Sequence, residues 1–152
     1  MASSRIPAII DALLAACSAN AGLVGVTVYD GPPTTNETEP DLLFIGASDD
    51  QNGDIGFTQD WAGQGSQRRK ETFDIPCLAV SRQGGTVMKT SRDRVFTITA
   101  AVESLLQADA TLGVSGYTVR AQYGTSGSAG QVQSPNGALV RVRFNVHVET
   151  RL

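Results

Sequence analysis

Two stretches of the chain place apolar side chains at steps of three and four residues, the spacing that gives a helix one buried side. The first stretch covers residues 5–20, and its apolar positions are Ile6, Ile9, Ile10, Leu13, Leu14 and Cys17. Ser3 and Ser4 precede it as N-cap candidates, and Pro7 falls in the first turn, where a missing N–H costs nothing. The second stretch covers residues 91–110, with apolar positions at Val95, Ile98, Val102, Leu105 and Leu106. The spacing predicts two amphipathic helices.

Five further stretches are typical of β-strands. Residues 139–150 alternate most regularly: valine or phenylalanine fills the even positions from 140 to 148, and the odd positions between them hold Arg141, Arg143, Asn145, His147 and Glu149. Such alternation predicts one face in the core and one in water or at an interface. Alternation over 23–29, 68–82 and 117–123 predicts three more strands. Residues 42–45 are wholly apolar, which predicts a short central strand covered on both faces.

The elements follow one another in the order α-β-β-β-α-β-β, which indicates an α+β fold. We expect an antiparallel or mixed β-sheet with both helices packed on one face. The other face, which carries Arg120, Gln122, Arg141 and Arg143, should stay polar. Pro76 lies within the strand predicted at 68–82, and because it has no N–H to donate, that strand should lie at a sheet edge or be bulged there.

The polar stretches between these elements are long. Residues 47–66 are rich in aspartate and glycine, and residues 124–137 are rich in glycine and serine and end in Pro-Asn-Gly. We predict a single domain over residues 1–152 with long loops at 47–66 and 124–137. The first exceeds ordinary loop length, which indicates either a functional loop or a hairpin.

Composition narrows the classes of function. A formal net charge of -3 gives no electrostatic basis for specific nucleic-acid recognition or for a polybasic membrane contact. Cys17 and Cys77 both lie in apolar patterns and are expected to be free, buried thiols. The first twenty residues show a helical period and not the continuous apolar block of a secretory signal, so we expect a soluble protein made in a reducing cytoplasm.

The sequence offers little for catalysis. His147 is the chain's single histidine and falls in the polar half of a strand, where a solvated or interface role is the simpler interpretation. No nucleophile turn, phosphate loop, dinucleotide fingerprint or common zinc pattern is present. A calcium loop starting at Asp50 fails, since Ile55 and Trp61 occupy the positions that need glycine and glutamate. We therefore expect no enzymatic activity, no metal and no cofactor.

Charged and aromatic side chains in the long loops are the better candidates, as contacts to other proteins. The predicted interface residues are Asp49, Asp50, Asp60, Trp61, Arg68, Arg69, Lys70, Arg141 and Arg143. The acidic and basic members offer complementary patches for unlike surfaces of neighbouring subunits. Phe57 and Trp61 have two interpretations, as a local apolar cluster or as anchors in a partner surface.

The order of several short motifs resembles a known family. They are VTVYDGPP at 26–33, LLFIG at 42–46, ETFDIPC at 71–77, Arg92 at the start of the second helix, and LLQADATLG at 105–113. Together with the N-terminal helix and the closing strand, this pattern spans nearly the whole chain. It resembles the tail terminator proteins of long-tailed, siphovirus-like bacteriophages, of the type found in actinobacteriophages.

The resemblance implies a structural role. Tail terminators form hexameric rings at the head-proximal end of the tail tube, where they stop tube polymerisation and present a surface for head–tail joining. The implied partners are further copies of the chain, the tail tube protein and the head-completion or neck proteins, and the implied location is the neck region of the virion after assembly in the host cytoplasm. Two alternatives stay open: another neck protein, for head closure or tail completion, or a small non-viral binding module.

Overall fold

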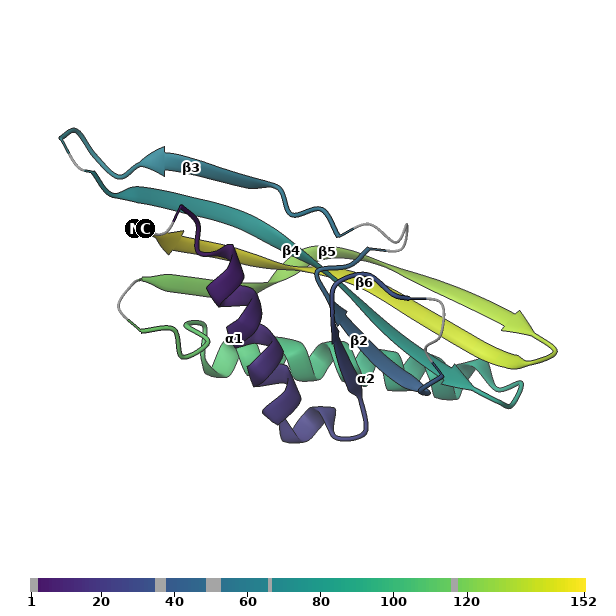
Figure 1. Ribbon diagram of the computed structural model, residues 1–152. Coiled ribbons are helices and arrows are strands. Elements are labelled where there is room, and N and C mark those ends of the chain that lie inside the picture. Colours follow the sequence, from purple (N-terminus) through teal and green to yellow (C-terminus); the bar gives the residue numbers. More distant parts are fainter. Residues whose placement is uncertain (1–2, 35–37, 49–52, 66, 116–117) are drawn as a thin grey trace.

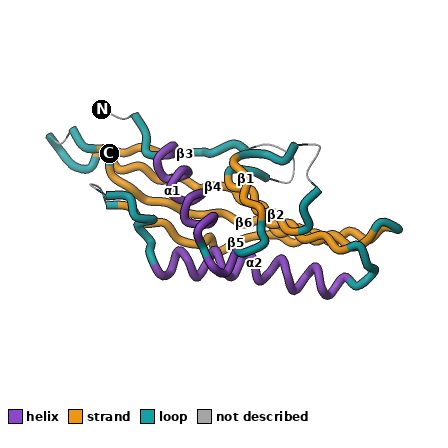
Figure 2. The backbone as a smooth tube through the Cα atoms, turned by 60° about the horizontal axis from the view of Figure 1, so that its bottom comes forward, coloured by secondary structure: helices purple, strands orange, loops and turns teal. Residues whose placement is uncertain are grey.

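The computed structural model describes residues 3–34, 38–48, 53–65, 67–115 and 118–152. Two helices lie on one face of a six-stranded mixed sheet (Figures 1 and 2). The strand order is β1-β2-β4-β6-β5, with β3 paired to β4 beyond the end of β2. The elements are α1 (Ile6–Ala19), β1 (Thr27–Asp30), β2 (Asp41–Ile45), β3 (Phe57–Trp61), β4 (Arg69–Gln83), α2 (Met88–Ala108), β5 (Val119–Ser134) and β6 (Gly137–Arg151). The predicted α+β class is confirmed, with β3 as one strand more than the predicted order.

The main core lies between the helices and the sheet. Each helix buries its predicted stripe there: Ile9, Leu13 and Cys17 from α1, and Val95, Ile98, Val102 and Leu106 from α2. The even-numbered residues 140–148 of β6 are all buried in the same core, as the alternation predicted. Among the described residues, no helix is both long enough and apolar enough to cross a membrane.

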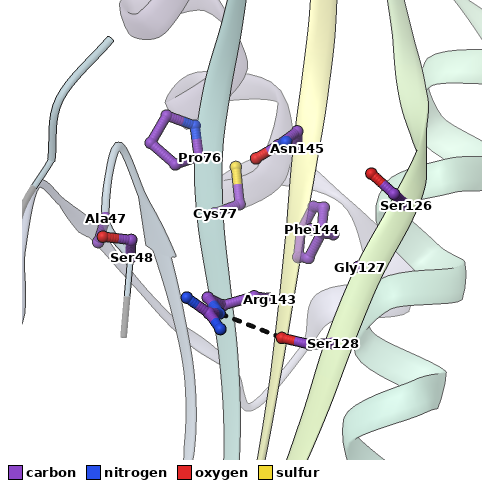
Figure 3. A pocket seen from close by; sticks show the side chains of 10 residues that line it. All are labelled: Ala47, Ser48, Pro76, Cys77, Ser126, Gly127, Ser128, Arg143, Phe144 and Asn145. Carbon is purple, nitrogen blue, oxygen red and sulfur yellow. Dashed lines mark hydrogen bonds between the residues drawn. The ribbon is translucent and has the colours of Figure 1, made fainter. Parts of the chain in front are cut away.

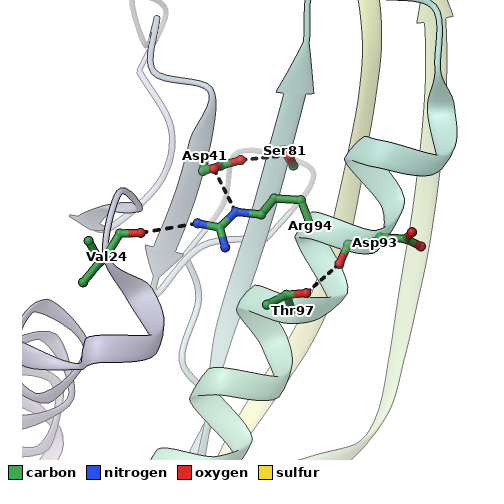
Figure 4. A network of polar contacts seen from close by, with 6 residues as sticks. All are labelled: Val24, Asp41, Ser81, Asp93, Arg94 and Thr97. Atoms are coloured by element: carbon green, nitrogen blue, oxygen red, sulfur yellow. Dashed lines mark hydrogen bonds and ion pairs between the residues drawn. The ribbon is translucent and has the colours of Figure 1, made fainter.

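A polar cluster fixes α2 against the start of β2 (Figure 4). The Arg94 guanidinium contacts the Asp41 carboxylate, with 3.0 Å between Nε and Oδ2, and the Ser81 hydroxyl donates to the other oxygen of that carboxylate at 2.8 Å. A second guanidinium nitrogen lies 3.4 Å from the backbone carbonyl oxygen of Val24. One side chain of α2 thus joins three segments that are far apart in the sequence.

The strand predicted at 23–29 begins later than expected. Residues 21–23 instead form a short 3-10 helix, whose Leu23 side chain is buried in the core. The Asn20 side chain accepts a hydrogen bond from the Gly22 N–H at 2.7 Å, and the Val26 N–H donates to the Leu23 carbonyl at 3.1 Å. These local hydrogen bonds hold the chain in a turn, so β1 starts only at Thr27.

The sheet face away from the helices is less polar than predicted. Leu42, Phe44, Ala47, Leu78 and Val80 form a second buried cluster there. The rings of Tyr29 and Phe44 stack with 5.4 Å between their centroids. The prediction that residues 42–45 are covered on both faces is confirmed, because Leu43 and Ile45 belong to the main core. The expectation of a wholly polar outer face is wrong at the β2 end of the sheet.

Of the two reasons predicted for tolerating Pro76, a sheet edge is wrong and a bulge fits, because the two consecutive residues Gly46 and Ala47 lie opposite it. Strand β4 is central, with β6 along one side and with β2 and β3 sharing the other. Pro76 lies in the interval between the residues that pair with β2 and those that pair with β3. Its carbonyl accepts from the N–H groups of Gly46 and Ala47 at 2.8 and 2.9 Å. Residue 76 has no ladder partner in β2 or β3. No N–H is therefore needed at this position, and a proline fits inside a central strand.

Both predicted long loops contain strand. Within 47–66, residues 57–61 form β3, which pairs with β4 as a hairpin. Within 124–137, residues up to Ser134 continue β5, which pairs with β6 to the end of that hairpin after a register shift between Tyr123 and Gly127. Ladder hydrogen bonds come from backbone groups. Pairing with the long, regular strand β6 therefore makes a strand of this glycine- and serine-rich segment, although the side chains of the segment do not predict one.

Candidate functional site

The β3–β4 hairpin forms an arm, residues 57–73, that extends past the N-terminal end of α1 (Figure 1). Register pairs Phe57 with Phe73 and Trp61 with Arg69, and the turn is closed by the Ala62 N–H donating to the Arg68 carbonyl at 2.9 Å. Residues opposite each other in a sheet share a face. Because Phe73 belongs to the core under the helices, Phe57 and Trp61 also lie on the helix side.

The two aromatic side chains of the arm are open to solvent. Phe57 is 57% exposed and Trp61 is 69% exposed. A closed local cluster would bury them, so that interpretation is wrong, and the other, anchors in a partner surface, stays a prediction. An exposed tryptophan on a projecting arm is the side chain that most often contributes strongly to a protein interface.

The charged candidates of the arm divide between its two faces. Arg69 lies on the helix side and donates to the Gln59 side-chain oxygen at 2.7 Å. Asp60 and Lys70 are register partners on the outer face, where Lys70 also lies 3.6 Å from Glu149. Asp60 and Lys70, which were predicted to contact unlike surfaces of neighbouring subunits, thus lie opposite each other within one chain. Arg68 is exposed in the turn, and the predicted Asp49 and Asp50 lie outside the described residues.

A buried carboxylate, which the sequence pattern did not predict, fastens the arm to α1. Glu71 is fully buried, and its two oxygens accept from the Arg5 backbone N–H and from the Gln59 side-chain amide, each at 2.8 Å. The same amide also donates to the Ser3 carbonyl at 2.8 Å. Glu71 serves as the cap of α1 from a distant strand, together with Ser4, whose hydroxyl accepts from the Ile6 N–H at 3.1 Å.

Replacing Glu71 with glutamine should lower the free energy of unfolding by about 1–3 kcal/mol, because a hydrogen bond to a buried charged group is lost and a buried donor is left without an acceptor. Chemical denaturation of the two proteins measures this difference. Glu149→Gln is the matched control: Glu149 is a partly exposed carboxylate in the strand beside β4, and its loss should change stability by less than about 1 kcal/mol. Equal effects at the two positions would contradict an anchoring role for Glu71.

Arg141 and Arg143 lie on the outer face of β6, away from the arm's aromatic residues. Arg143 lines a shallow pocket of about 340 Å³ between β4, β6 and β5, and its Nε donates to the Ser128 hydroxyl at 3.1 Å (Figure 3). Register places Arg143 opposite Leu78 and Arg141 opposite Val80. The basic side chains therefore border the second apolar cluster.

The outer face of β4, β5 and β6 is strongly basic, although the formal net charge of the whole chain is -3. Six of the twelve lysines and arginines lie there against two carboxylates, Asp74 and Glu149. The six are Lys70, Arg82, Arg120, Arg141, Arg143 and Arg151. Thirteen carboxylates and six cations remain for the rest of the sequence. This face matches an acidic partner surface.

The remaining polar groups suit structure better than catalysis. Across the described residues, the imidazole of His147 contacts carboxylates only, Asp74 at 2.8 Å and Glu149 at 3.7 Å, and no described hydroxyl or thiol bonds to it. Burial raises the pKa of the Cys17 thiol to about 11 and raises that of Cys77 further, so neither is a ready nucleophile. The described residues contain no group of three potential metal ligands.

Comparison with known proteins finds similarity in fold. No protein-family model and no curated protein matches the chain. Among solved structures, a chain of the structure described as "Virion of native gene transfer agent (GTA) particle" superposes with a TM-score of 0.59 at 16% sequence identity. The superposition covers 99% of this chain and 100% of that chain, so the whole fold of the protein is that of a virion-particle chain.

Proposed function

We propose that this protein is a non-enzymatic structural subunit of a bacteriophage-type virion, and specifically a tail terminator that forms a hexameric ring at the head-proximal end of the tail tube. The observation that carries the proposal is the end-to-end match in fold to a chain of a gene transfer agent virion. The short motifs that resemble tail terminators support the finer assignment.

The surface of the molecule suits a subunit of an assembly. Two hairpins, β3–β4 and β5–β6, project from opposite ends of the body, and each carries an exposed apolar side chain, Trp61 and Val132 respectively (Figures 1 and 2). A ring subunit needs two unlike surfaces for its two neighbours. In this proposal the basic outer face, with Arg141 and Arg143, contacts an acidic surface of the tube protein or of a neck protein.

The alternative is another neck protein, for head closure or tail completion. The two functions differ in the neighbour that is bound first. A tail terminator binds the end of the tail tube, whereas a head-closure protein binds the head side of the neck and ignores isolated tubes.

Electron microscopy of the purified protein, alone and mixed with its tail tube protein, tests the proposal. We expect rings, or caps at the ends of tubes, and tubes that become shorter as the ratio of terminator to tube protein rises. Binding to heads in place of tubes would support the alternative. Protein that binds neither would overturn the assignment to a virion.

A further inference from the structure

Three arginines gather at one end of the basic outer face, where the strand register forms three short rows across β4, β6 and β5. The rows are Arg82–Leu139–Val132, Val80–Arg141–Gly130 and Leu78–Arg143–Ser128. Arginines thus alternate with apolar side chains on this part of the sheet. No aspartate or glutamate occurs in the strand segments 78–82, 139–143 and 128–132. These segments therefore supply no negative charge to the three arginines.

Arg141 is the member of the group whose side chain lacks a partner. Arg143 donates to the Ser128 hydroxyl at 3.1 Å, and Arg82 has a contact of its own. Across the part of the chain that the structure describes, no group bonds to the guanidinium of Arg141, although its Nε is buried. A buried donor without an acceptor lowers stability, so a carboxylate brought by another molecule would relieve that cost.

The surface beside Arg141 has room for such a carboxylate. Its register partner in β5 is Gly130, and apart from the chain neighbours no described atom lies within 4 Å of the place that a Cβ there would take. Val132 follows two residues later, so it shares the outer face, and it is 48% exposed. The hollow over Gly130 therefore lies between a cation and an exposed apolar side chain.

These features fit a protein better than a nucleic acid. A phosphate backbone would match the arginines but would leave Val132 and the half-buried Leu139 without an apolar contact. Asp74 and Glu149, farther along the same face, would repel it. A protein segment that carries an acidic side chain next to an apolar one matches both parts of this surface.

Resting on the tail-terminator function proposed above, we propose that Arg141 binds a carboxylate of the tail tube protein over Gly130, while an apolar side chain next to that carboxylate packs on Val132. Arginine suits this role because its planar head can donate two hydrogen bonds to one carboxylate. The apolar neighbours exclude water from the ion pair, which strengthens it. Arg141 is then the residue of the basic face that contributes most to binding.

Co-sedimentation with purified tail tubes measures this contribution, and circular dichroism checks that each variant folds. Arg141→Gln removes the charge and keeps a polar side chain, so binding should weaken by about 10-fold to 100-fold, as expected for loss of a hydrogen-bonded ion pair. Gly130→Val fills the hollow and leaves every charge in place, and it should weaken binding by about 10-fold. Arg92→Gln is the matched control: it removes the same charge from α2, across the sheet, and should change binding by less than about 3-fold.

Crosslinking identifies the group that lies against position 141. A water-soluble carbodiimide joins amines to carboxylates, and the chain's own lysines are Lys70 and Lys89 alone. Arg141→Lys therefore places a new reactive amine at the site. Mass spectrometry of this variant on tubes should show position 141 joined to an aspartate or glutamate of the tube protein. Arg92→Lys, treated in the same way, should give no such product.

The outcomes separate this contact from the function on which it rests. Tube binding that Arg141→Gln and Gly130→Val leave unchanged would overturn the contact while the terminator function stands. A crosslink from position 141 only to a second copy of the chain would overturn it too, assigning this face to the ring itself. Tighter binding to duplex DNA than to tubes, lost in Arg141→Gln, would overturn it in favour of nucleic acid. Unaltered protein that ignores tubes would instead remove the terminator function, and the contact with it.

Discussion

Replacing Phe44 with alanine should lower the free energy of unfolding by about 3–5 kcal/mol, the range for loss of a buried phenylalanine that leaves a cavity. Phe44 is 2% exposed on the outer face of β2, where it stacks on Tyr29 and lies opposite Leu78. Urea denaturation followed by circular dichroism measures the change, provided that unfolding is two-state.

Phe57→Ala is the matched control for this prediction. It removes the same side chain from a strand of the same sheet at a position that is 57% exposed, so the loss should be under about 1 kcal/mol. If Phe44→Ala cost no more than the control, the second apolar cluster would not be part of the stable fold of the single chain.

Replacing Gly137 with alanine should cost about 2–5 kcal/mol, since it combines backbone strain with overpacking. Gly137 opens β6 after the turn at Pro135 and Asn136, with a φ of +127° that side chains rarely allow. A Cβ there would lie 1.9 Å from the carbonyl oxygen of Gln83, a backbone atom at the end of β4. Thermal unfolding should show a lower midpoint temperature.

Gly130→Ala tests whether the effect is specific to that position. Gly130 lies in the same β5–β6 hairpin and has no positive φ. Among the described residues, only its chain neighbours lie within 4 Å of the place that a Cβ would take. Its substitution should change stability by no more than about 0.5 kcal/mol. A comparable loss at both positions would indicate that the hairpin needs glycine for general flexibility and not for the close contact with Gln83.

Much of the fold follows from the sequence because burial leaves a local periodic pattern. The stripes of α1 and α2, the alternation in β6 and the apolar run of β2 each predicted the surfaces that the structure buries. The candidate interface was predicted less completely. Trp61, Arg68 and Lys70 are exposed, whereas Arg69 is half-buried and bonded to Gln59. The alternation predicted that Arg120, Arg141 and Arg143 share a face, and the strand register adds Lys70, Arg82 and Arg151 to it.

The features that escaped prediction depend on partners outside the segment itself. The ladder of β6 makes a strand of residues 124–134, and β4 does the same for β3, through backbone groups that carry no side-chain signal. Glu71 caps α1 by accepting from the N–H of Arg5, 66 positions earlier in the chain. By itself the sequence determined the class of fold and the two faces of its regular elements, since those follow from the period of each segment. Only the tertiary structure decided which edges stay open and that Lys70, Arg82 and Arg151 join the arginines of β5 and β6 on one face, because both depend on the pairing of strands across the sheet.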